Sequence, residues 1–161
     1  TVLKSALNGV REEFEFVLID CPPSLGLLTL NALAVSTSVL IPMQCEYYAL
    51  QGLSHLLKTL KLIKKSINPD LKVEGILLTM FDSRTLLATQ VKDQVQKYFS
   101  DFLLKTVIPR NVRLSEAPSH GKPIMLYASR SRGADSYVEL AKEIISRSKT
   151  DERTSLSGSA V

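Results

Sequence analysis

The sequence predicts a doubly wound α/β fold, in which a mostly parallel sheet carries helices on both faces. Short apolar runs rich in Val, Ile and Leu alternate along the chain with longer segments whose apolar residues recur at helical spacing. The short runs lack the polar alternation of half-exposed strands, so each is expected to be a strand buried on both faces. The chain has 161 residues, 45% hydrophobic and 22% charged, which is enough for one globular domain with a core.

The first part of the chain contains both kinds of segment. The run FVLI at 16–19 is short, continuous and rich in β-branched residues, which is typical of a buried strand. The expected elements, in chain order, are a helix over 2–10, a strand over 16–19, a helix over 25–34, a strand from Ser38 that ends at Pro42, and a helix over 48–67.

The second part continues the alternation and then becomes polar. The expected elements are a strand over 73–81, a helix over 86–99, a strand over 103–109, a loop with one helical turn over 110–124, and a helix over 134–148. Residues 149–161 are small and polar, so a disordered tail is expected there. The predicted organisation is therefore one domain over 1–148 and a tail over 149–161.

Asp20 ends the first predicted strand, where parallel sheets bind their ligands. The carboxyl ends of parallel strands share one rim, which also receives the loops after Met43, Phe81 and Ile108. A carboxylate at the tip of an apolar strand is a position at which nucleotide-hydrolysing folds hold Mg²⁺. Pro22 and Pro23 are expected to stiffen the turn that follows. The alternative is a strand-ending aspartate that only caps this turn.

Charge and cysteine content narrow the choice of function. Cys21 and Cys45 are isolated in apolar surroundings and lack a metal-binding spacing, which is typical of reduced cytosolic thiols. No apolar run reaches the length of a membrane span. Residues 105–132 carry one acid, Glu116, which is expected to pair with a nearby arginine, and six bases: Lys105, Arg110, Arg113, Lys122, Arg130 and Arg132. This excess fits either a polyanionic partner or a solvated surface.

Several long strings resemble one known family. The segment VLIDCPPSLGLLTLNAL is similar to the Walker B and switch II region of ParA/Soj chromosome-partitioning ATPases, which belong to the deviant-Walker class of P-loop NTPases. The resemblance continues through LIPMQCEYYALQGLSHLL, GILLTMFDSRTLLATQV, VIPRNVRLSEAPSHGKPI and SRGADSYVELAKEI, and it covers about residues 1–147.

The chain departs from the family pattern in one respect. The family's glycine-rich phosphate-binding loop and its switch I aspartate both precede Walker B, and neither string occurs in this sequence. The expectation is therefore a C-terminal part of such a protein, incomplete at its N-terminus. Without the amide cradle and the phosphate-binding lysines, the chain alone is not expected to hydrolyse ATP, and no catalytic residue is assigned.

The resemblance implies roles for particular residues. Asp20 would hold the magnesium ion of a bound ATP, and Pro109 and Asn111 match the loop that contacts adenine. For those two, a strand-ending proline followed by an Asn turn is the alternative. Arg84 and Arg113 match arginines implicated in non-specific DNA binding. Lys122, Arg130 and Arg132 either extend that patch or serve only solubility. The implied protein is a cytoplasmic, nucleoid-associated ATPase of chromosome or plasmid partitioning that forms an ATP-dependent homodimer, binds double-stranded DNA and responds to a ParB/Spo0J-type partner.

Two other functions stay open at this point. A membrane-surface ATPase like MinD would end in a basic amphipathic helix, whereas the C-terminal residues here have no sustained apolar face, so no membrane partner is expected. A non-catalytic interaction module derived from the family would lack the phosphate-binding loop, as this chain does. Its exposed strand edges would then need protection.

Overall fold

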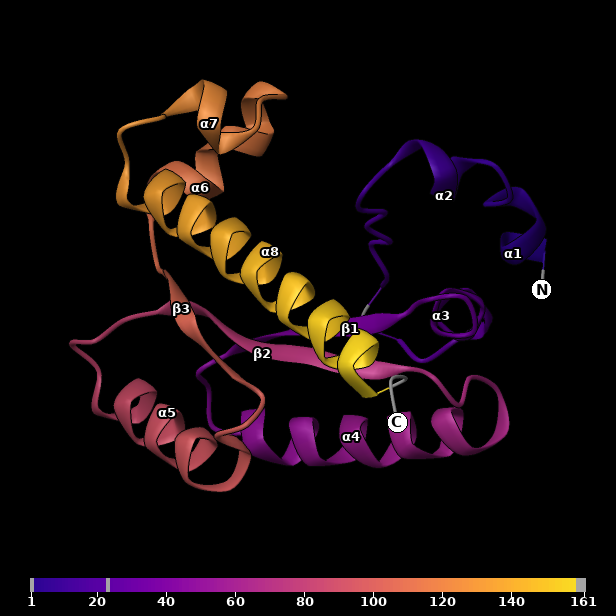
Figure 1. Cartoon of the computed structure of the whole chain (residues 1–161). Coiled ribbons are helices and arrows are strands. Elements are labelled where there is room, and N and C mark those ends of the chain that lie inside the picture. The colour runs from indigo at the N-terminus through magenta and orange to yellow at the C-terminus, as the bar shows by residue number, and fades with distance from the viewer. Residues whose placement is uncertain (1, 23, 159–161) are drawn as a thin grey trace. The chain divides into compact units, whose positions relative to one another are not determined.

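The computed structural model describes residues 2–22 and 24–158 (Figure 1). The chain divides into two compact units. The first unit comprises Thr1–Val39 and Leu53–Val73, and the second comprises Leu40–Gly52 and Glu74–Val161. Among the helices of the described residues, none combines the length and the apolar character that crossing a membrane requires.

The first unit is helical. Its helices are α1 (Val2–Ala6), α2 (Val10–Glu13), α3 (Leu27–Leu33) and most of α4 (Ala49–Ser66). A single helix over 2–10 is predicted by the sequence, but the chain breaks between α1 and α2 at Gly9, whose φ of 93° lies in the left-handed region. α3 and α4 lie where the sequence predicts helices.

The end of α3 is held by a side chain from beyond α4. The Asn68 side-chain amide donates hydrogen bonds to the carbonyl oxygens of Leu33, at 2.9 Å, and Ser36, at 2.8 Å. Carbonyl groups at the end of a helix lack partners within the helix, so these two bonds satisfy acceptors that the helix leaves open. The predicted turn after α4 is thereby joined to the end of α3.

The predicted strand at 16–19 is wrong. These residues form no strand in the structure, and Phe16, Val17, Leu18 and Ile19 are all exposed, with Leu18 91% accessible. A strand exists only where its N–H and C=O groups pair with a neighbour, and none of the described strands pairs with this segment. The apolar run therefore lies outside the sheet.

The sheet belongs to the second unit, apart from the first two residues of β1 and β2. Its strands are β1 (Ser38–Gln44), β2 (Lys72–Phe81) and β3 (Leu103–Pro109), in the order β1-β2-β3, and β2 is parallel to β3. β1 continues through Pro42, its predicted end, which an outer strand allows because the missing N–H need not pair.

Two helices flank β3. Both α5 (Leu86–Phe99) and α8 (Arg132–Gly158) contact this strand, and Figure 1 shows them on opposite sides of it. Leu77, Leu104, Ile108 and Leu140 form the buried cluster between sheet and α8, and Leu114 and Ile144 pack against it. The α/β class, with a parallel pair of strands covered on both faces, is confirmed.

β3 contains a bulge whose amides are bound by a carboxylate of α8. Ile76 pairs with Leu103 and Leu78 with Val107, so β3 has two extra residues at this point. The backbone N–H groups of Lys105 and Thr106 both donate to the Glu143 carboxylate, each at 2.8 Å. These two donors, which the bulge leaves without ladder partners, are satisfied from the helix.

Glu143 is ionised because these hydrogen bonds lower its pKa by more than burial raises it. Burial alone raises the pKa of Glu143, but the hydrogen bonds from Lys105 and Thr106 and the charge of Arg147 leave this pKa below its ordinary value. Arg147 lies 3.6 Å from Glu143 and donates to the carbonyl oxygens of Glu74 and Leu103. α8 is therefore attached to the sheet by polar as well as apolar contacts.

The connection between β3 and α8 is more helical than predicted. It contains α6 (Val112–Glu116), a 3₁₀ turn η1 (Ala117–His120) and α7 (Ile124–Tyr127), all of which contact one another. Figure 1 shows α6 and α7 gathered near the start of α8. The close approach of α6 to α8 requires Gly133, because a Cβ there would lie 2.6 Å from Leu114 Cγ.

The last helix is longer than the sequence predicts. α8 begins at Arg132 and ends at Gly158, beyond the predicted end at Ser148. Residues 159–161 lie outside the described residues, and the disordered tail over 149–161 stays a prediction.

Candidate functional site

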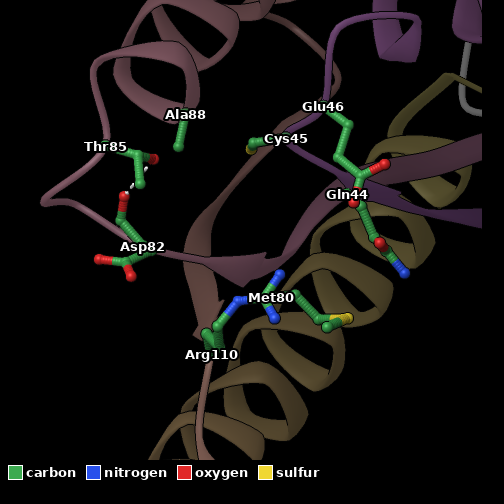
Figure 2. Close-up of a pocket in the computed structure, with 8 residues that line it drawn as sticks. All are labelled: Gln44, Cys45, Glu46, Met80, Asp82, Thr85, Ala88 and Arg110. Carbon is green, nitrogen blue, oxygen red and sulfur yellow. Dashed lines mark hydrogen bonds between the residues drawn. The ribbon is translucent and has the colours of Figure 1, made fainter.

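A pocket of about 240 Å³ lies in the second unit where the three strands end. Its lining comes from the end of β1 and the loop after it, from the end of β2 and the loop that follows, from the first turn of α5, and from the residue after β3: Gln44, Cys45, Glu46, Met80, Asp82, Thr85, Ala88 and Arg110. Figure 2 shows Asp82 and Thr85 on one side, Gln44 and Glu46 on the other, and Arg110 between them. The predicted meeting of these three loops on one rim is confirmed. The prediction that Asp20 ends a strand of the same sheet is wrong, because residues 16–19 form no strand.

A second bulge shapes this rim. Leu78 pairs with Val107 and Phe81 with Pro109, so β2 has one extra residue between these pairs. Met80 lies in that interval with φ of 49°, an uncommon conformation for a residue with a side chain. Bulges redirect side chains near the ends of strands, and Met80 here lines the pocket. No sequence signal distinguishes this methionine, because the conformation depends on the register with β3.

Asp82 is the most strongly perturbed acid on the rim. Its carboxylate accepts hydrogen bonds from Arg84 Nε at 2.9 Å, from Arg84 Nη2 at 2.7 Å and from the Arg84 backbone N–H at 3.1 Å. These bonds, with a smaller effect of the nearby Arg110 charge, hold the pKa of Asp82 far below its ordinary value. Thr85 closes the turn by donating from Oγ1 to the Asp82 carbonyl at 2.9 Å. Asp82 is therefore a carboxylate at neutral pH, and it lies between the pocket and Arg84.

The pocket thiol is not an activated nucleophile. Cys45 is buried, and burial raises the pKa of its thiol, with the positive charge of Lys92 opposing this only in part. Both cysteines are free thiols. Among the described residues, no group of three or more His, Cys, Asp or Glu side chains is arranged to hold a metal ion.

The two predicted adenine-contact residues flank the pocket residue Arg110. Pro109 is the last residue of β3 and pairs with Phe81. Asn111 is the N-cap of α6, where its Oδ1 accepts a hydrogen bond from the Arg113 backbone N–H at 2.9 Å. The Asn turn that the sequence left open is thus present. Arg110, which the sequence indicated only as part of a basic stretch, lines the pocket itself.

The predicted DNA-contact residues are exposed, on the loop after β2, on α6 and on the turn after η1. Arg84 lies between β2 and α5 with its side chain 86% exposed, and Arg113 lies in α6 with its side chain 60% exposed. Lys122 is exposed in the turn after η1. The predicted pairing of Glu116 is confirmed, because Arg113 Nη1 donates to Glu116 Oε2 at 2.9 Å.

Glu116 has a second donor. The Tyr127 hydroxyl donates to the same Oε2 at 3.1 Å, and the Tyr127 ring stacks on His120 with centroids 4.8 Å apart. The hydrogen bonds from Tyr127 and Arg113 lower the pKa of Glu116. Arg113 and Glu116 are therefore both charged, and they are tied to α7 through Tyr127.

Asp20, the predicted magnesium ligand, belongs to the first unit and is exposed. It precedes a turn in which Thr29 Oγ1 donates to the Ser24 carbonyl at 2.6 Å, which holds the turn to the start of α3. Pro23 lies outside the described residues. An exposed carboxylate is the hard, anionic oxygen donor that Mg²⁺ prefers, and Mg²⁺ keeps several waters, so one such side chain suits this ion.

Comparison with known proteins identifies the relatives of the chain. The family described as "AAA domain" matches residues 1–73. Over 142 residues the chain is 64% identical to the sporulation initiation inhibitor protein Soj of Bacillus subtilis, covering 88% of this chain and 56% of that protein. Over 145 residues it is 58% identical to the chromosome partitioning protein ParA of Myxococcus xanthus, covering 90% of this chain and 51% of that protein.

A solved structure agrees with the fold. Cobyrinic acid a,c-diamide synthase from Mycobacterium smegmatis, crystallised with bound ADP and magnesium, is 36% identical, with a TM-score of 0.73 over 92% of this chain and 54% of that one. The chain spans about half the length of the curated relatives that it matches. Its sequence shows that the chain belongs to the ParA/Soj family.

Proposed function

We propose that this chain is part of an ATP-dependent partitioning protein whose nucleotide-bound dimer binds double-stranded DNA without sequence specificity. A ParB/Spo0J-type partner would stimulate hydrolysis and so release the DNA, and the protein would be cytoplasmic and associated with the nucleoid. The observation that carries this proposal is the 64% identity to Soj over 142 residues. Two exposed arginines on loops beyond β2 and β3 support the DNA part of it.

The nucleotide would be ATP with Mg²⁺, as the ADP and magnesium in the related diamide synthase suggest. Asp20 would supply an oxygen ligand to the ion, which when bound neutralises phosphate charge. Pro109 and Asn111 would border the base, next to the Arg110 side chain that lines the pocket. The phosphate-binding loop is not part of this sequence, so the 161-residue chain alone is expected to show no ATP hydrolysis.

DNA contact would be made through phosphates. Guanidinium groups bind phosphate oxygens by two parallel N–H bonds and read no sequence, and Arg84 and Arg113 each present such a group to solvent. Lys122 adds a positive charge on the loop that follows α6 and η1. Binding of this kind weakens steeply with salt, because each phosphate contact releases a counterion.

The test uses the complete gene product with a non-hydrolysable ATP analogue and duplex DNA. Arg84→Ala and Arg113→Ala are each expected to weaken retention and to reduce the slope of log affinity against log salt by about one. Lys142→Ala is the matched control, since Lys142 is an exposed cation on α8 that pairs with Glu139. Retention that stays at the wild-type level, with the same salt slope, in both arginine variants would refute the DNA assignment.

A further inference from the structure

Both arginines that would contact DNA are already paired with a carboxylate two or three residues away in the chain. Arg84 binds Asp82 through Nε and Nη2, at 2.9 and 2.7 Å, and Arg113 binds Glu116 through Nη1 at 2.9 Å. The first pair lies in the loop after β2 and the second lies on α6, so they are independent observations of one arrangement.

We propose that Asp82 and Glu116 act as internal substitutes for DNA phosphate, which compete with DNA for Arg84 and Arg113 and set the affinity of this surface. The inference rests on the proposed DNA binding and deepens it, because it names residues that regulate the same site. DNA would bind by exchanging a carboxylate for a phosphate at each arginine, and the two acids would keep non-specific affinity low.

The Asp82 pair has the geometry that a phosphate would use. Two neighbouring guanidinium nitrogens of Arg84 meet the two carboxylate oxygens, which is the bidentate arrangement that arginine also forms with phosphate. The Arg84 backbone N–H binds Asp82 as well, so the loop itself holds the acid in place. A phosphate that approaches Arg84 by this face must first displace Asp82.

The Glu116 pair is held by a donor that does not depend on Arg113. Tyr127 donates to Glu116 Oε2 from α7, and its ring is stacked on His120. Glu116 therefore stays beside Arg113 even when the arginine side chain moves. Both partners are open to solvent, with side chains 60% and 38% exposed, so a phosphate can reach the pair.

A different role for the acids predicts the opposite result. If Asp82 and Glu116 orient the arginines for DNA, their removal releases flexible side chains and weakens binding. If they compete with phosphate, their removal frees a cation and strengthens binding. The sign of the change in affinity separates the two roles.

The experiment measures binding of a fluorescent duplex to the complete gene product with a non-hydrolysable ATP analogue at several salt concentrations. Asp82→Asn and Glu116→Gln are each expected to bind about two- to fivefold more tightly than the control, as the strength of exposed ion pairs indicates. The salt slope should stay close to that of the wild type, because Arg84 and Arg113 contact the same number of phosphates in either case. The control is Glu139→Gln, which removes the same charge from an exposed pair with Lys142 on α8.

Two further variants test the mechanism. Tyr127→Phe leaves the net charge unchanged and removes the second donor to Glu116. Its gain in DNA affinity is expected to be smaller than that of Glu116→Gln. In an Arg113→Ala background, Glu116→Gln should give no gain beyond that of Glu139→Gln, because its effect passes through Arg113. Thermal unfolding of each variant checks that the fold is retained.

The possible outcomes are distinct. If wild-type protein does not bind DNA at all, the proposed function fails. If wild-type protein binds and Arg113→Ala weakens binding, but neither Asp82→Asn nor Glu116→Gln exceeds Glu139→Gln, the function stands and this inference is overturned.

Discussion

Individual residues of the rim differ in how far the sequence predicts them. The pairing of Glu116 with a nearby arginine is predictable, because both lie in one short stretch with a single acid. The Asp82–Arg84 pair is not, since residues two apart face each other only in particular turns, here one closed by the Thr85 hydroxyl. The contact of Glu143 with β3 is equally hidden, because it joins positions far apart in the sequence.

The two thiols should differ in reactivity. Cys45 is buried and burial raises its pKa, whereas Cys21 is half-buried. In the native chain, a thiol reagent such as DTNB is expected to label Cys21 first and Cys45 only on unfolding, because the thiolate is the reactive form. A Cys21→Ser chain that still reacts at the wild-type rate would contradict this.

Glu143 should contribute stability that depends on pH. Glu143→Gln keeps the shape but removes the charge that binds two amides, so the free energy of unfolding at neutral pH is expected to fall by about 1–3 kcal/mol. Its folded pKa lies below the unfolded value, so this stability is present above the ordinary glutamate pKa and is lost as pH falls through the folded pKa.

Urea denaturation at a series of pH values measures the effect. The difference between wild type and Glu143→Gln should narrow on acidification, because wild-type Glu143 then takes up a proton. Glu139→Gln, at an exposed pair on the same helix, should show little change at any pH. A Glu143→Gln difference that stays constant down to strongly acidic pH would rule out this account.

At the scale of elements, the sequence predicts a helix or strand correctly where the pattern that determines the element lies within its own residues. The helix over 86–99 and the strand over 103–109 coincide with α5 and β3, because periodicity and length are local properties. The run at 16–19 has an equally strong strand signal, but pairing decides whether a strand forms. α6 and α7 are too short to show periodicity, and a cap at Asn111 and mutual packing produce them.

The junction between α6 and α8 should be sensitive to one methyl group. Gly133→Ala would place a Cβ 2.6 Å from Leu114 Cγ, so α6 must shift, and a loss of about 1–3 kcal/mol in unfolding free energy is expected. Because α6 carries Arg113, DNA retention by the complete gene product should fall as well.

Gly52→Ala is the matched control for Gly133→Ala. Gly52 lies inside α4, and a Cβ there meets no atom within 4 Å. Alanine is the better helix former, so a gain of about 0.5–1 kcal/mol is expected. The free energy of unfolding of both variants is measured by chemical denaturation. Equal changes in the two would show that close packing at Gly133 is unimportant.

At the scale of the whole molecule, the apolar segment before α3 exposes several large side chains in a row. Phe14 and Leu18 are 60% and 91% exposed, in a row with Phe16, Val17 and Ile19. Clustered apolar surface of this kind binds hydrophobic dyes and promotes self-association. The isolated 161-residue chain is therefore expected to enhance ANS fluorescence and to form oligomers that dissociate on dilution.

Substitution within the segment should reduce both signals. Leu18→Ser is expected to lower dye binding and the oligomer fraction in analytical ultracentrifugation. Leu126→Ser, at an α7 position outside this segment that is 76% exposed, should leave them nearly unchanged. A monomeric wild-type chain without dye binding would show that these side chains are covered in solution.

The bulge in β3 has a consequence for how the sheet meets other polypeptides. β3 is one of the two outer strands in the order β1-β2-β3 of the described residues, and the N–H groups of Lys105 and Thr106 are bound by Glu143. An extended peptide of another molecule that lay beside β3 could not accept hydrogen bonds from these two N–H groups. The bulge would also put its backbone out of register with β3. Glu143 therefore occupies two backbone donors of β3 that would otherwise be open to an added strand.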